Sequence, residues 1–231
     1  MNNFITGFID QFKGWSRFEK LLISVVTIML LITSYMWQDT PFGIFTTLAG
    51  VMCVVLVAKG NRYNYFWGLI NVTCYGIIAY NSNYAGDFIL NIGFYLPMQF
   101  IGLYMWNKHY NVDSDTVASR GFTTRDWIVT IVAIAIGTIV IGLLMPTVNN
   151  LLGMEANPRP FVDAFTTFGS IYAQILMARR FSEQWYLWIV VNLFSIVMWI
   201  TLKDSAMVIM FTAYLINAIY GAYNWKQMEQ A

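Results

Sequence analysis

The chain has 231 residues, of which 58% are hydrophobic, 17% aromatic and only 11% charged, and its formal net charge is +1. Soluble domains carry about 25% charged residues, so this chain cannot cover the surface of a globule in water. The composition excludes a soluble enzyme, a disordered protein and a nucleic-acid-binding protein, which needs a basic patch. Two cysteines and one histidine also exclude a disulfide framework and a multi-histidine zinc site. We therefore expect an integral membrane protein without cofactor or metal.

Residues 1–20 precede the first long apolar segment. Phe4, Phe8, Phe12 and Trp15 recur with helical spacing, and basic residues lie between them. This pattern predicts a short amphipathic helix at the membrane interface; the alternative is a frayed tail. The first apolar segment has no small-residue cleavage site after it, so it is not a cleavable signal.

Eight apolar segments follow, each able to cross a bilayer once flanking Trp and Tyr residues extend it to the interface. They are 21–37, 42–58, 64–80, 88–106, 127–145, 161–178, 184–201 and 205–224. Since they use nearly all of the chain, we predict an all-α integral membrane protein with eight transmembrane helices. The longest polar connection, 107–126, is predicted to be a linker between two halves.

The basic residues give the orientation. With eight spans both termini lie on one side, and eleven of the thirteen Lys and Arg residues fall on that side. Positive residues are enriched in cytoplasmic loops. We therefore predict a multi-pass protein of the bacterial inner membrane with both termini cytoplasmic.

Short motifs recur about 120 residues apart, which indicates an internal repeat. The matches, in order, are Phe45-Thr46-Thr47 with Phe165-Thr166-Thr167, Lys59 with Arg179, Trp67-x-x-x-Asn71 with Trp188-x-x-x-Asn192, Tyr95 with Tyr214, and Gly102-x-Tyr104-x-Trp106 with Gly221-x-Tyr223-x-Trp225. Each repeat holds three helices, and segment 127–145 has no counterpart.

This repeat predicts a 1+3+1+3 arrangement. Its parts are residues 1–38 with the interfacial segment and an extra helix, 39–107 with the first repeat, 108–159 with the cytoplasmic linker and linker helix, and 160–231 with the second repeat. The single linker helix makes the two repeats parallel. Transporters built from repeats bind their substrate near the membrane midplane, between the repeats, and we expect the same here.

Polar and aromatic side chains form stripes along the predicted helices. Polar groups in lipid are costly and usually face the bundle interior, so these stripes are expected to line the substrate cavity. The candidate substrate-binding residues are Trp188, Asn192, Gln99, Trp67, Asn71, Tyr95, Trp185, Asn217, Tyr214, Thr167, Asp163 and Gln174.

Structural roles compete with this interpretation. Asn and Gln side chains also bond neighbouring helices, and Asp163 is a candidate cap for the helix that starts at Pro160. Gly102 and Gly221 fit close helix packing better than ligand contact. Trp106 and Trp225, near the ends of their helices, are expected to be interface anchors.

The cavity chemistry limits the substrate. No predicted span carries Lys or Arg at depth, so a phosphorylated substrate would lack a cation to bind it. Trp and Tyr faces suit a flat cation, and amides suit hydroxyl groups. We expect a neutral or cationic small molecule with an aromatic part and a polyol part. Without a paired carboxylate or nucleophile at depth, neither ion coupling nor enzymatic activity is indicated.

The stretch YLPMQFIGLYMWNK, which contains Gln99, together with WGLIN at 67–71 and WIVVN at 188–192, resembles the PnuC family of vitamin B3 transporters. The resemblance covers about 40–225. It implies uptake of nicotinamide riboside by facilitated diffusion, a fold related to the SWEET sugar transporters and a homotrimer. It also implies that a separate kinase traps the substrate inside the cell.

Carried over to this chain, the family's motif points to Gln99, Trp188 and Asn192 as binding residues, and less directly to Asn71. Nicotinamide riboside has a pyridinium ring, an amide and a ribose without phosphate, which fits the cavity chemistry. Relatives in the same family carry thiamine or riboflavin, so another flat aromatic vitamin is the alternative substrate. A membrane sensor and a membrane enzyme are the remaining alternatives.

Overall fold

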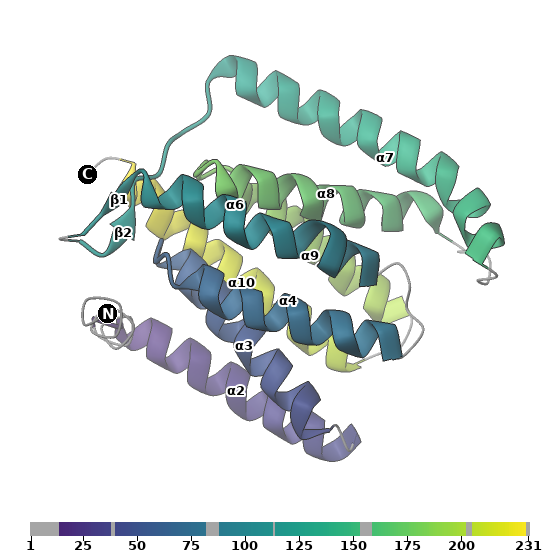
Figure 1. Ribbon diagram of the computed structural model, residues 1–231, viewed down its shortest axis with the longest axis horizontal. Helices are drawn as coiled ribbons and strands as arrows, with labels where there is room; N and C mark the ends of the chain where they lie inside the picture. Colours follow the sequence, from purple (N-terminus) through teal and green to yellow (C-terminus); the bar gives the residue numbers. More distant parts are fainter. Residues whose placement is uncertain are drawn as a thin grey trace. The chain divides into compact units, whose positions relative to one another are not determined.

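The computed structural model describes residues 14–37, 40–81, 88–112, 114–152, 159–201 and 205–229. In the first part of this range the helices are α2 (Arg17–Trp37), α3 (Pro41–Ala58), α4 (Asn64–Asn81) and a π-helix, η1 (Ile89–Tyr95), that continues directly into α6 (Leu96–Asn107) (Figure 1). Two strands follow, β1 (Tyr110–Asn111) and β2 (Thr116–Val117), and then α7 (Thr124–Leu152), α8 (Pro160–Ala178), α9 (Gln184–Thr201) and α10 (Ser205–Met228).

The described residues thus contain the eight predicted helical segments, with η1 and α6 forming the fourth. Five helices are long and apolar enough to cross a membrane by length and composition: α2, α3, α7, α8 and α9. The predicted interfacial helix falls mostly on residues 1–13, outside the described residues.

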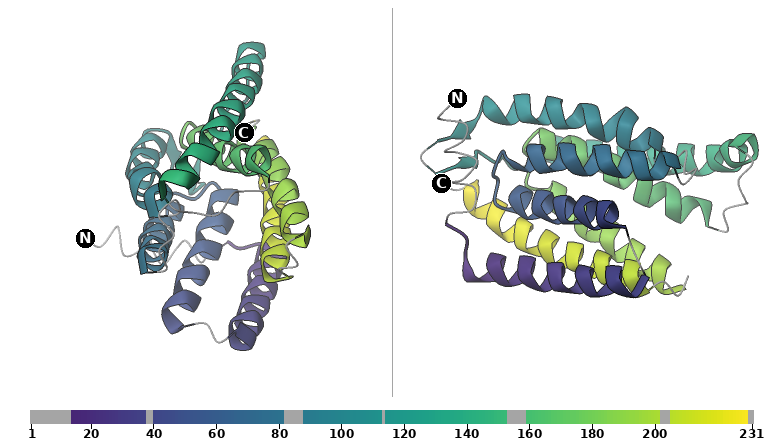
Figure 2. Two further views of the ribbon diagram at one scale, coloured as in Figure 1. Left: turned by 90° about the vertical axis from the view of Figure 1, so that its right-hand side faces the viewer. Right: turned by 60° about the horizontal axis from the view of Figure 1, so that its bottom comes forward.

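Two compact units divide the chain between Ala118 and Ser119, inside the predicted linker. In the first unit α2 packs on α3, α3 on α4, and α4 on η1 and α6. In the second unit α7 packs along α8, α8 on α9, and α9 on α10 (Figure 2). Each unit therefore holds four helical segments in chain order.

The predicted linker, residues 107–126, contains two short strands in an otherwise helical fold. Strands β1 and β2 pair antiparallel in a small hairpin. The Tyr110 hydroxyl donates to the Asp115 carbonyl oxygen at 2.7 Å, and Asn61 Nδ2 donates to Asp115 Oδ2 at 2.8 Å. Burial and the nearby Asp115 carboxylate raise the pKa of Tyr110. These contacts tie the hairpin to the α3–α4 loop of the same unit.

Equivalent backbone bonds form the α3–α4 and α8–α9 loops. In the first loop Lys59, Gly60 and Asn61 donate to the carbonyls of Val55, Val57 and Leu56. In the second, residues 179, 180 and 181 donate to the carbonyls of residues 175, 177 and 176. Both turns need a left-handed residue, which is Gly60 (φ 69°) in the first and Arg180 (φ 66°) in the second. Glycine takes this conformation freely, whereas a residue with a side chain takes it at a cost.

Two prolines lie within helical rods. Pro97 lies in the first turn of α6, directly after η1, and the Leu96 N–H donates to the Asn91 carbonyl. A proline has no N–H, and its ring crowds the carbonyl four residues earlier in a regular α-helix. The π-helix η1, which has a wider turn, lies directly before Pro97. Pro146 lies inside α7, which continues beyond the predicted end at residue 145; such prolines are tolerated in membrane helices.

Candidate functional site

The glycines of the predicted repeat are close-packing positions. A Cβ at Gly102 would meet the Tyr65 ring, and a Cβ at Gly221 would meet the Trp185 ring. Each ring also packs edge-on against a tryptophan of the same unit, Tyr65 on Trp106 at 5.0 Å and Trp185 on Trp225 at 6.0 Å between centroids. The prediction for the two glycines is confirmed.

Trp106 and Trp225 are both 0% exposed. The prediction that they are interface anchors is therefore wrong: near the ends of α6 and α10 they pack edge-on against the Tyr65 and Trp185 rings, which fill the space beside the glycines. Trp185, a candidate binding residue, is buried in the same contact. Its ring acts chiefly in packing α9 against α10.

In the first unit Asn71 is held by the backbone of a neighbouring helix. Its Nδ2 donates to the Thr46 carbonyl oxygen at 2.8 Å. Gly50 of α3 makes room for this amide, because a Cβ at Gly50 would lie 2.8 Å from Asn71 Nδ2. The bond joins α3 to α4, as expected for an interhelical amide.

Gln99 lies between α4 and α6 and is 6% exposed. Its Nε2 donates to the Tyr95 carbonyl at 3.0 Å, and its Oε1 occupies the space that a side chain at Gly68 would fill. Trp67 and Tyr95 are half-buried. The structure thus brings Gln99 and Tyr95 into contact, on α6 and at the end of η1.

The second unit holds the other eight candidates. On α9, Asn192 and Ser195 are buried one turn apart, and Trp188 is half-buried. On α10, Asn217 is buried, and Tyr214 packs edge-on against Phe211. Burial of Asn192, Ser195 and Asn217 agrees with polar faces that point inward within this unit, and their role in substrate binding stays a prediction.

On α8, Gln174 is buried, whereas Asp163 and Thr167 are half-buried. Asp163 lies in the first helical turn, and the N-cap residue Arg159 makes no side-chain capping bond. A carboxylate in this turn is favourable because the helix dipole places partial positive charge there. Asp163 is thus not the N-cap residue that one interpretation of the sequence proposed.

One motif match is out of register. The loop hydrogen bonds align residues 59–61 with 179–181, and α4 and α9 both have 18 residues that start 120 positions apart. In this register Asn192 corresponds to Val72, and Asn71 corresponds to Val191. The pairing of Asn71 with Asn192, at a spacing of 121, is therefore wrong, because it would need an extra residue in a regular helix.

Two fully buried polar side chains were missed as candidates. Asn64 and Gln184 are 0% exposed and occupy equivalent first positions of α4 and α9. Asn64 Nδ2 donates to the Asn61 carbonyl at 2.7 Å, while neither amide atom of Gln184 has a partner among the described residues. The regular spacing of 120 residues is the signal that could have found this pair.

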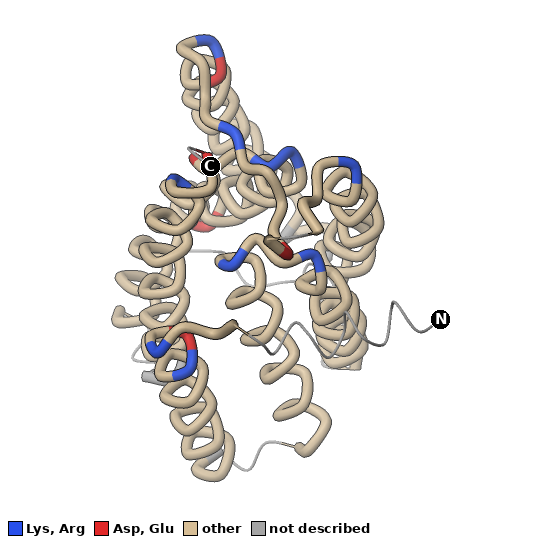
Figure 3. The backbone as a smooth tube through the Cα atoms, turned by 90° about the vertical axis from the view of Figure 1, so that its left-hand side faces the viewer, with Lys and Arg blue, Asp and Glu red and all other residues tan. Residues whose placement is uncertain are grey.

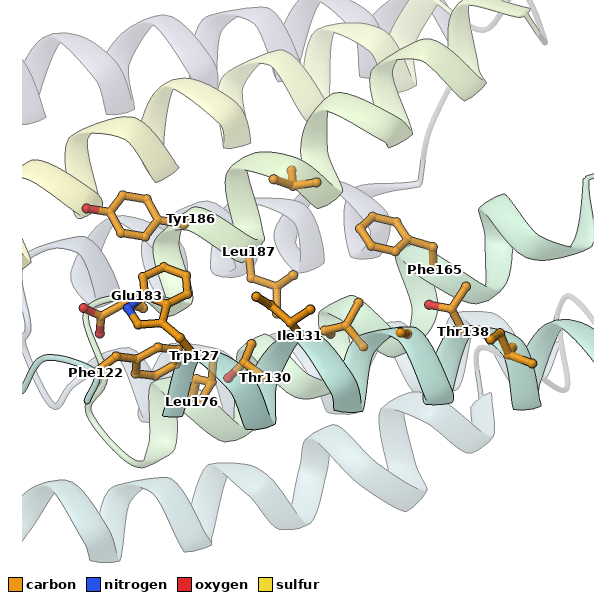
Figure 4. A pocket seen from close by; sticks show the side chains of 14 residues that line it. Phe122, Trp127, Thr130, Ile131, Thr138, Phe165, Leu176, Glu183, Tyr186 and Leu187 are labelled. Carbon is orange, nitrogen blue, oxygen red and sulfur yellow. The ribbon is translucent and has the colours of Figure 1, made fainter. Parts of the chain in front are cut away.

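A cavity of about 610 Å³ lies in the second unit, between α7 and the α8–α9 pair (Figure 4). Its walls are aliphatic and aromatic, with Thr130, Thr138 and Glu183 as the polar residues. None of the twelve candidate residues lines it. The cavity is thus distinct from the predicted substrate site.

Charged residues of the described chain lie at helix ends and in loops (Figure 3). In the first unit Lys59 Nζ and Glu19 Oε2 form an ion pair at 2.9 Å. In the second unit Lys226 Nζ pairs with Glu183 at 2.9 Å and with Glu229 at 3.0 Å. Among the described residues, no group of three or more His, Cys, Asp and Glu side chains could hold a metal ion.

Comparison with known proteins gives consistent results. The sequence model of the family described as nicotinamide mononucleotide transporter matches residues 40–227. The nicotinamide riboside transporter PnuC of Haemophilus influenzae is 35% identical, with 94% of this chain and 92% of the relative covered. The PnuC of Neisseria mucosa is 31% identical, with 95% and 84% covered, and that of Escherichia coli is 27% identical, with 78% and 82% covered.

A solved structure agrees with these sequence matches. The crystal structure of the vitamin B3 transporter PnuC matches with a TM-score of 0.77 and 32% identity, over 95% of this chain and 94% of the other. The family model covers most of the chain, and relatives above 30% identity cover nearly all of it. The chain therefore belongs to the PnuC family of membrane transporters.

Proposed function

We propose that this protein is a membrane carrier for nicotinamide riboside. The observation that carries the proposal is the similarity to relatives named nicotinamide riboside transporters along more than nine tenths of the chain. The chemistry of the candidate residues supports the same substrate. A pyridinium ring is a flat cation, which Trp and Tyr faces attract, and the ribose hydroxyls suit Asn and Gln amides.

The family description names the mononucleotide, and the charge distribution argues for the riboside instead. Within the described residues, Lys and Arg side chains of the helices lie only in first or last turns, such as Arg17, Arg125 and Lys226. A phosphate group needs a cation or an unpaired helix N-terminus to replace its hydration. The interior of the helices offers no such cation.

We place the strongest substrate contacts at Gln99, Trp188 and Asn192. Trp67, Tyr95, Tyr214, Asn217, Thr167, Asp163 and Gln174 are proposed as further contacts. Trp185 is proposed to act through its packing on Gly221, and Asn71 through its bond to Thr46, which already uses one amide hydrogen.

The proposed architecture is one extra helix, α2, then a repeat of α3, α4 and η1–α6, a linker helix α7, and a second repeat of α8, α9 and α10. The matching loop hydrogen bonds and the matching glycine–aromatic contacts support it. We further propose a homotrimer in the bacterial inner membrane with both termini cytoplasmic.

Transport is proposed to be facilitated diffusion, with substrate trapped inside by a separate kinase. Uptake of labelled nicotinamide riboside into vesicles that contain only the purified protein tests this. We expect equilibration without accumulation, at the same rate with and without a proton gradient. Accumulation driven by the gradient would contradict the mechanism.

Isothermal titration of the detergent-purified protein with four compounds tests the substrate. Nicotinamide riboside is expected to bind, and nicotinamide mononucleotide, thiamine and riboflavin are expected to bind at least tenfold more weakly. Tighter binding of thiamine or riboflavin would agree with a carrier but would show that its substrate is not nicotinamide riboside. Equal binding of the mononucleotide would refute the argument from the missing interior cations.

A further inference from the structure

The apolar cavity between α7 and the α8–α9 pair is a long groove. On α7 its lining extends from Trp127 to Ile139, which is roughly 18 Å at 1.5 Å per residue. Trp127, Ile131 and Ile139 are exposed, so the groove is open along α7. Because α7 is long and apolar enough to cross a membrane, this opening is expected to face lipid. One leaflet holds about 15 Å of hydrocarbon, so the groove has the length of one acyl chain.

A buried carboxylate lies at one end of this groove. Glu183 is 5% exposed and belongs to the groove lining. Its Oε1 accepts a hydrogen bond from Lys226 Nζ at 2.9 Å, whereas its Oε2 is buried without a hydrogen-bond partner among the described residues. A buried polar atom without a partner is costly, and native structures contain few of them. A hydrogen-bond donor on a bound molecule would remove this cost.

The other polar side chains of the lining have less need of such a donor. Thr138 Oγ1 is also buried without a partner, but a threonine hydroxyl can donate to the carbonyl four residues earlier in its own helix. Thr130 Oγ1 lies 3.4 Å from the Tyr172 hydroxyl. An ionised carboxylate has no proton to donate, so only an added donor satisfies Glu183 Oε2.

The charges beside Glu183 favour a cationic donor. Lys226 Nζ lies 2.9 Å from Glu183 and 3.0 Å from Glu229, so one positive charge is shared by two carboxylates. The Arg120 guanidinium lies 3.9 Å from the centre of the Phe181 ring, and neither residue belongs to the groove lining. The three charges at Lys226 therefore leave one negative charge at this end of the groove.

Aromatic rings lie at the same end. Phe122 packs edge-on against Trp127 at 5.2 Å, and Trp127 stacks with Tyr186 at 6.4 Å between ring centres. Figure 4 shows these three rings together with Glu183. Aromatic faces attract ammonium groups, and Trp and Tyr residues favour the headgroup level of a membrane. The rings and the carboxylate therefore suit an ammonium group at the surface end of a lipid.

We propose that the second unit binds a phospholipid with a primary ammonium headgroup, phosphatidylethanolamine. One acyl chain lies in the groove between α7 and α9, and the ammonium donates to Glu183 Oε2. A primary ammonium carries both the N–H groups and the charge that this end requires, whereas a quaternary ammonium carries the charge alone. The transported substrate suits the groove less well, because the lining offers too few polar groups for a ribose.

Thermal unfolding of the detergent-purified full chain tests this proposal. Phosphatidylethanolamine, phosphatidylcholine and phosphatidylglycerol with the same acyl chains are added separately, and phosphoethanolamine provides the headgroup without chains. Phosphatidylethanolamine is expected to raise the melting temperature by several degrees more than each of the other three. Equal stabilisation by phosphatidylcholine or phosphatidylglycerol would overturn the proposal, because the primary ammonium would not be recognised. Equal stabilisation by phosphoethanolamine would overturn the role of the groove.

Two variants and a matched control locate the site. Glu183→Gln removes the carboxylate and is expected to weaken the apparent affinity for phosphatidylethanolamine at least threefold, to the level of phosphatidylcholine. Glu229→Gln is the control: Glu229 is bound by the same Lys226 and by the Ser182 hydroxyl but lies outside the groove lining, so the preference is expected to remain. Ala135→Trp fills the groove and is expected to weaken binding of both lipids.

Two further outcomes would refute the proposal. One is an unchanged preference for phosphatidylethanolamine in Glu183→Gln or, if that variant does not fold, unchanged lipid stabilisation in Ala135→Trp with the circular dichroism of the parent protein. The other is a smaller oligomeric mass of Ala135→Trp in light scattering, which would show that a second copy of the chain occupies the groove. None of these measurements involves the riboside, so the proposed function is tested separately.

Discussion

The two units contain equivalent helix-packing contacts that are made by different side chains. In both, a glycine near the end of the last helix receives an aromatic ring from the middle helix, and a buried tryptophan one turn later closes the contact. The ring is Tyr65 in the first unit and Trp185 in the second. Both loops before the middle helix make the same backbone bonds, with Gly60 in one and Arg180 in the other.

The polar groups of the helix interiors differ more than the packing does. In the first unit the amides of Asn71 and Gln99 bind backbone carbonyls of the same unit. In the second unit Asn192 is buried, and its position corresponds to Val72 of the first unit. The comparison shows that the two units share these packing contacts, whereas the polar groups of their helix interiors differ.

The largest expected effect comes from filling the glycine contacts. Gly102→Val and Gly221→Val are each expected to lower the free energy of unfolding by about 1–3 kcal/mol, because overpacking displaces a buried ring. Thermal unfolding in detergent measures this. Gly93→Val, at an exposed position of η1 whose nearest Cβ contact would be at 3.8 Å, is the control.

A Trp185→Tyr substitution in the Gly221→Val variant tests whether the contact between these two residues causes the loss of stability. A smaller ring is expected to recover part of the lost stability, as neighbours in contact are not additive. If the two changes were additive, the contact between Trp185 and Gly221 would not be the cause of the loss.

Substitution of Asn192 is expected to reduce mainly substrate affinity, whereas substitution of Asn71 is expected to reduce mainly stability. Asn192→Ala is expected to weaken riboside binding at least tenfold, which is about 1.4 kcal/mol. Asn71→Ala is expected to lower the melting temperature, because it leaves the Thr46 carbonyl without its side-chain donor, and to change the affinity less. Titration and thermal unfolding of both variants would show the contrast; an equal loss of affinity would contradict it.

The equivalent cations Lys59 and Arg179 are expected to differ as well. Lys59→Gln leaves the buried carboxylate of Glu19 without its ion-pair partner, and a loss of about 1–2 kcal/mol is expected. Arg179→Gln is expected to leave stability in lipid-free detergent unchanged within about 0.5 kcal/mol, as for an exposed surface residue. Similar losses for the two variants would refute this difference.

The smallest expected effect is at the left-handed turn. Gly60→Ala is expected to cost about 1 kcal/mol, because a residue with a Cβ is strained at this φ. Arg180→Gly is expected to be neutral or slightly stabilising for the same reason. A stabilising Gly60→Ala would show that the turn changes its conformation on substitution.

Much of this fold was predictable from the sequence, because apolar runs of membrane length can form little except helices. Gly102 and Gly221 were correctly identified as packing sites, because a glycine in a helix lets a neighbouring helix approach closely. The burial of Trp106 and Trp225 was not predictable, since an aromatic residue near a helix end is equally typical of an interface anchor. The β1–β2 hairpin was missed because its two-residue strands depend on Tyr110, Asn61 and Asp115 meeting in space.

The helix faces that carry the candidate residues were expected from their spacing, whereas a role of these residues in substrate binding stays a prediction. Asn192 and Asn217 are buried on the helix faces that their spacing indicated. The match of Trp67 and Asn71 with Trp188 and Asn192 depended on residue identity, whereas the helices are aligned by backbone bonds at their first turns. Only the coordinates of the two loops reveal that difference of one position.

The π-helix η1 lies where the first unit is one residue longer than the second. Tyr65 and Gly102 are separated by one residue more than Trp185 and Gly221, and the stretch between residues 81 and 102 that holds this insertion also contains η1. A π-helical turn takes up an added residue by widening, so the helix that follows keeps its rotational phase. The first unit therefore tolerates the insertion upstream of Gly102, and the glycine still faces its aromatic partner.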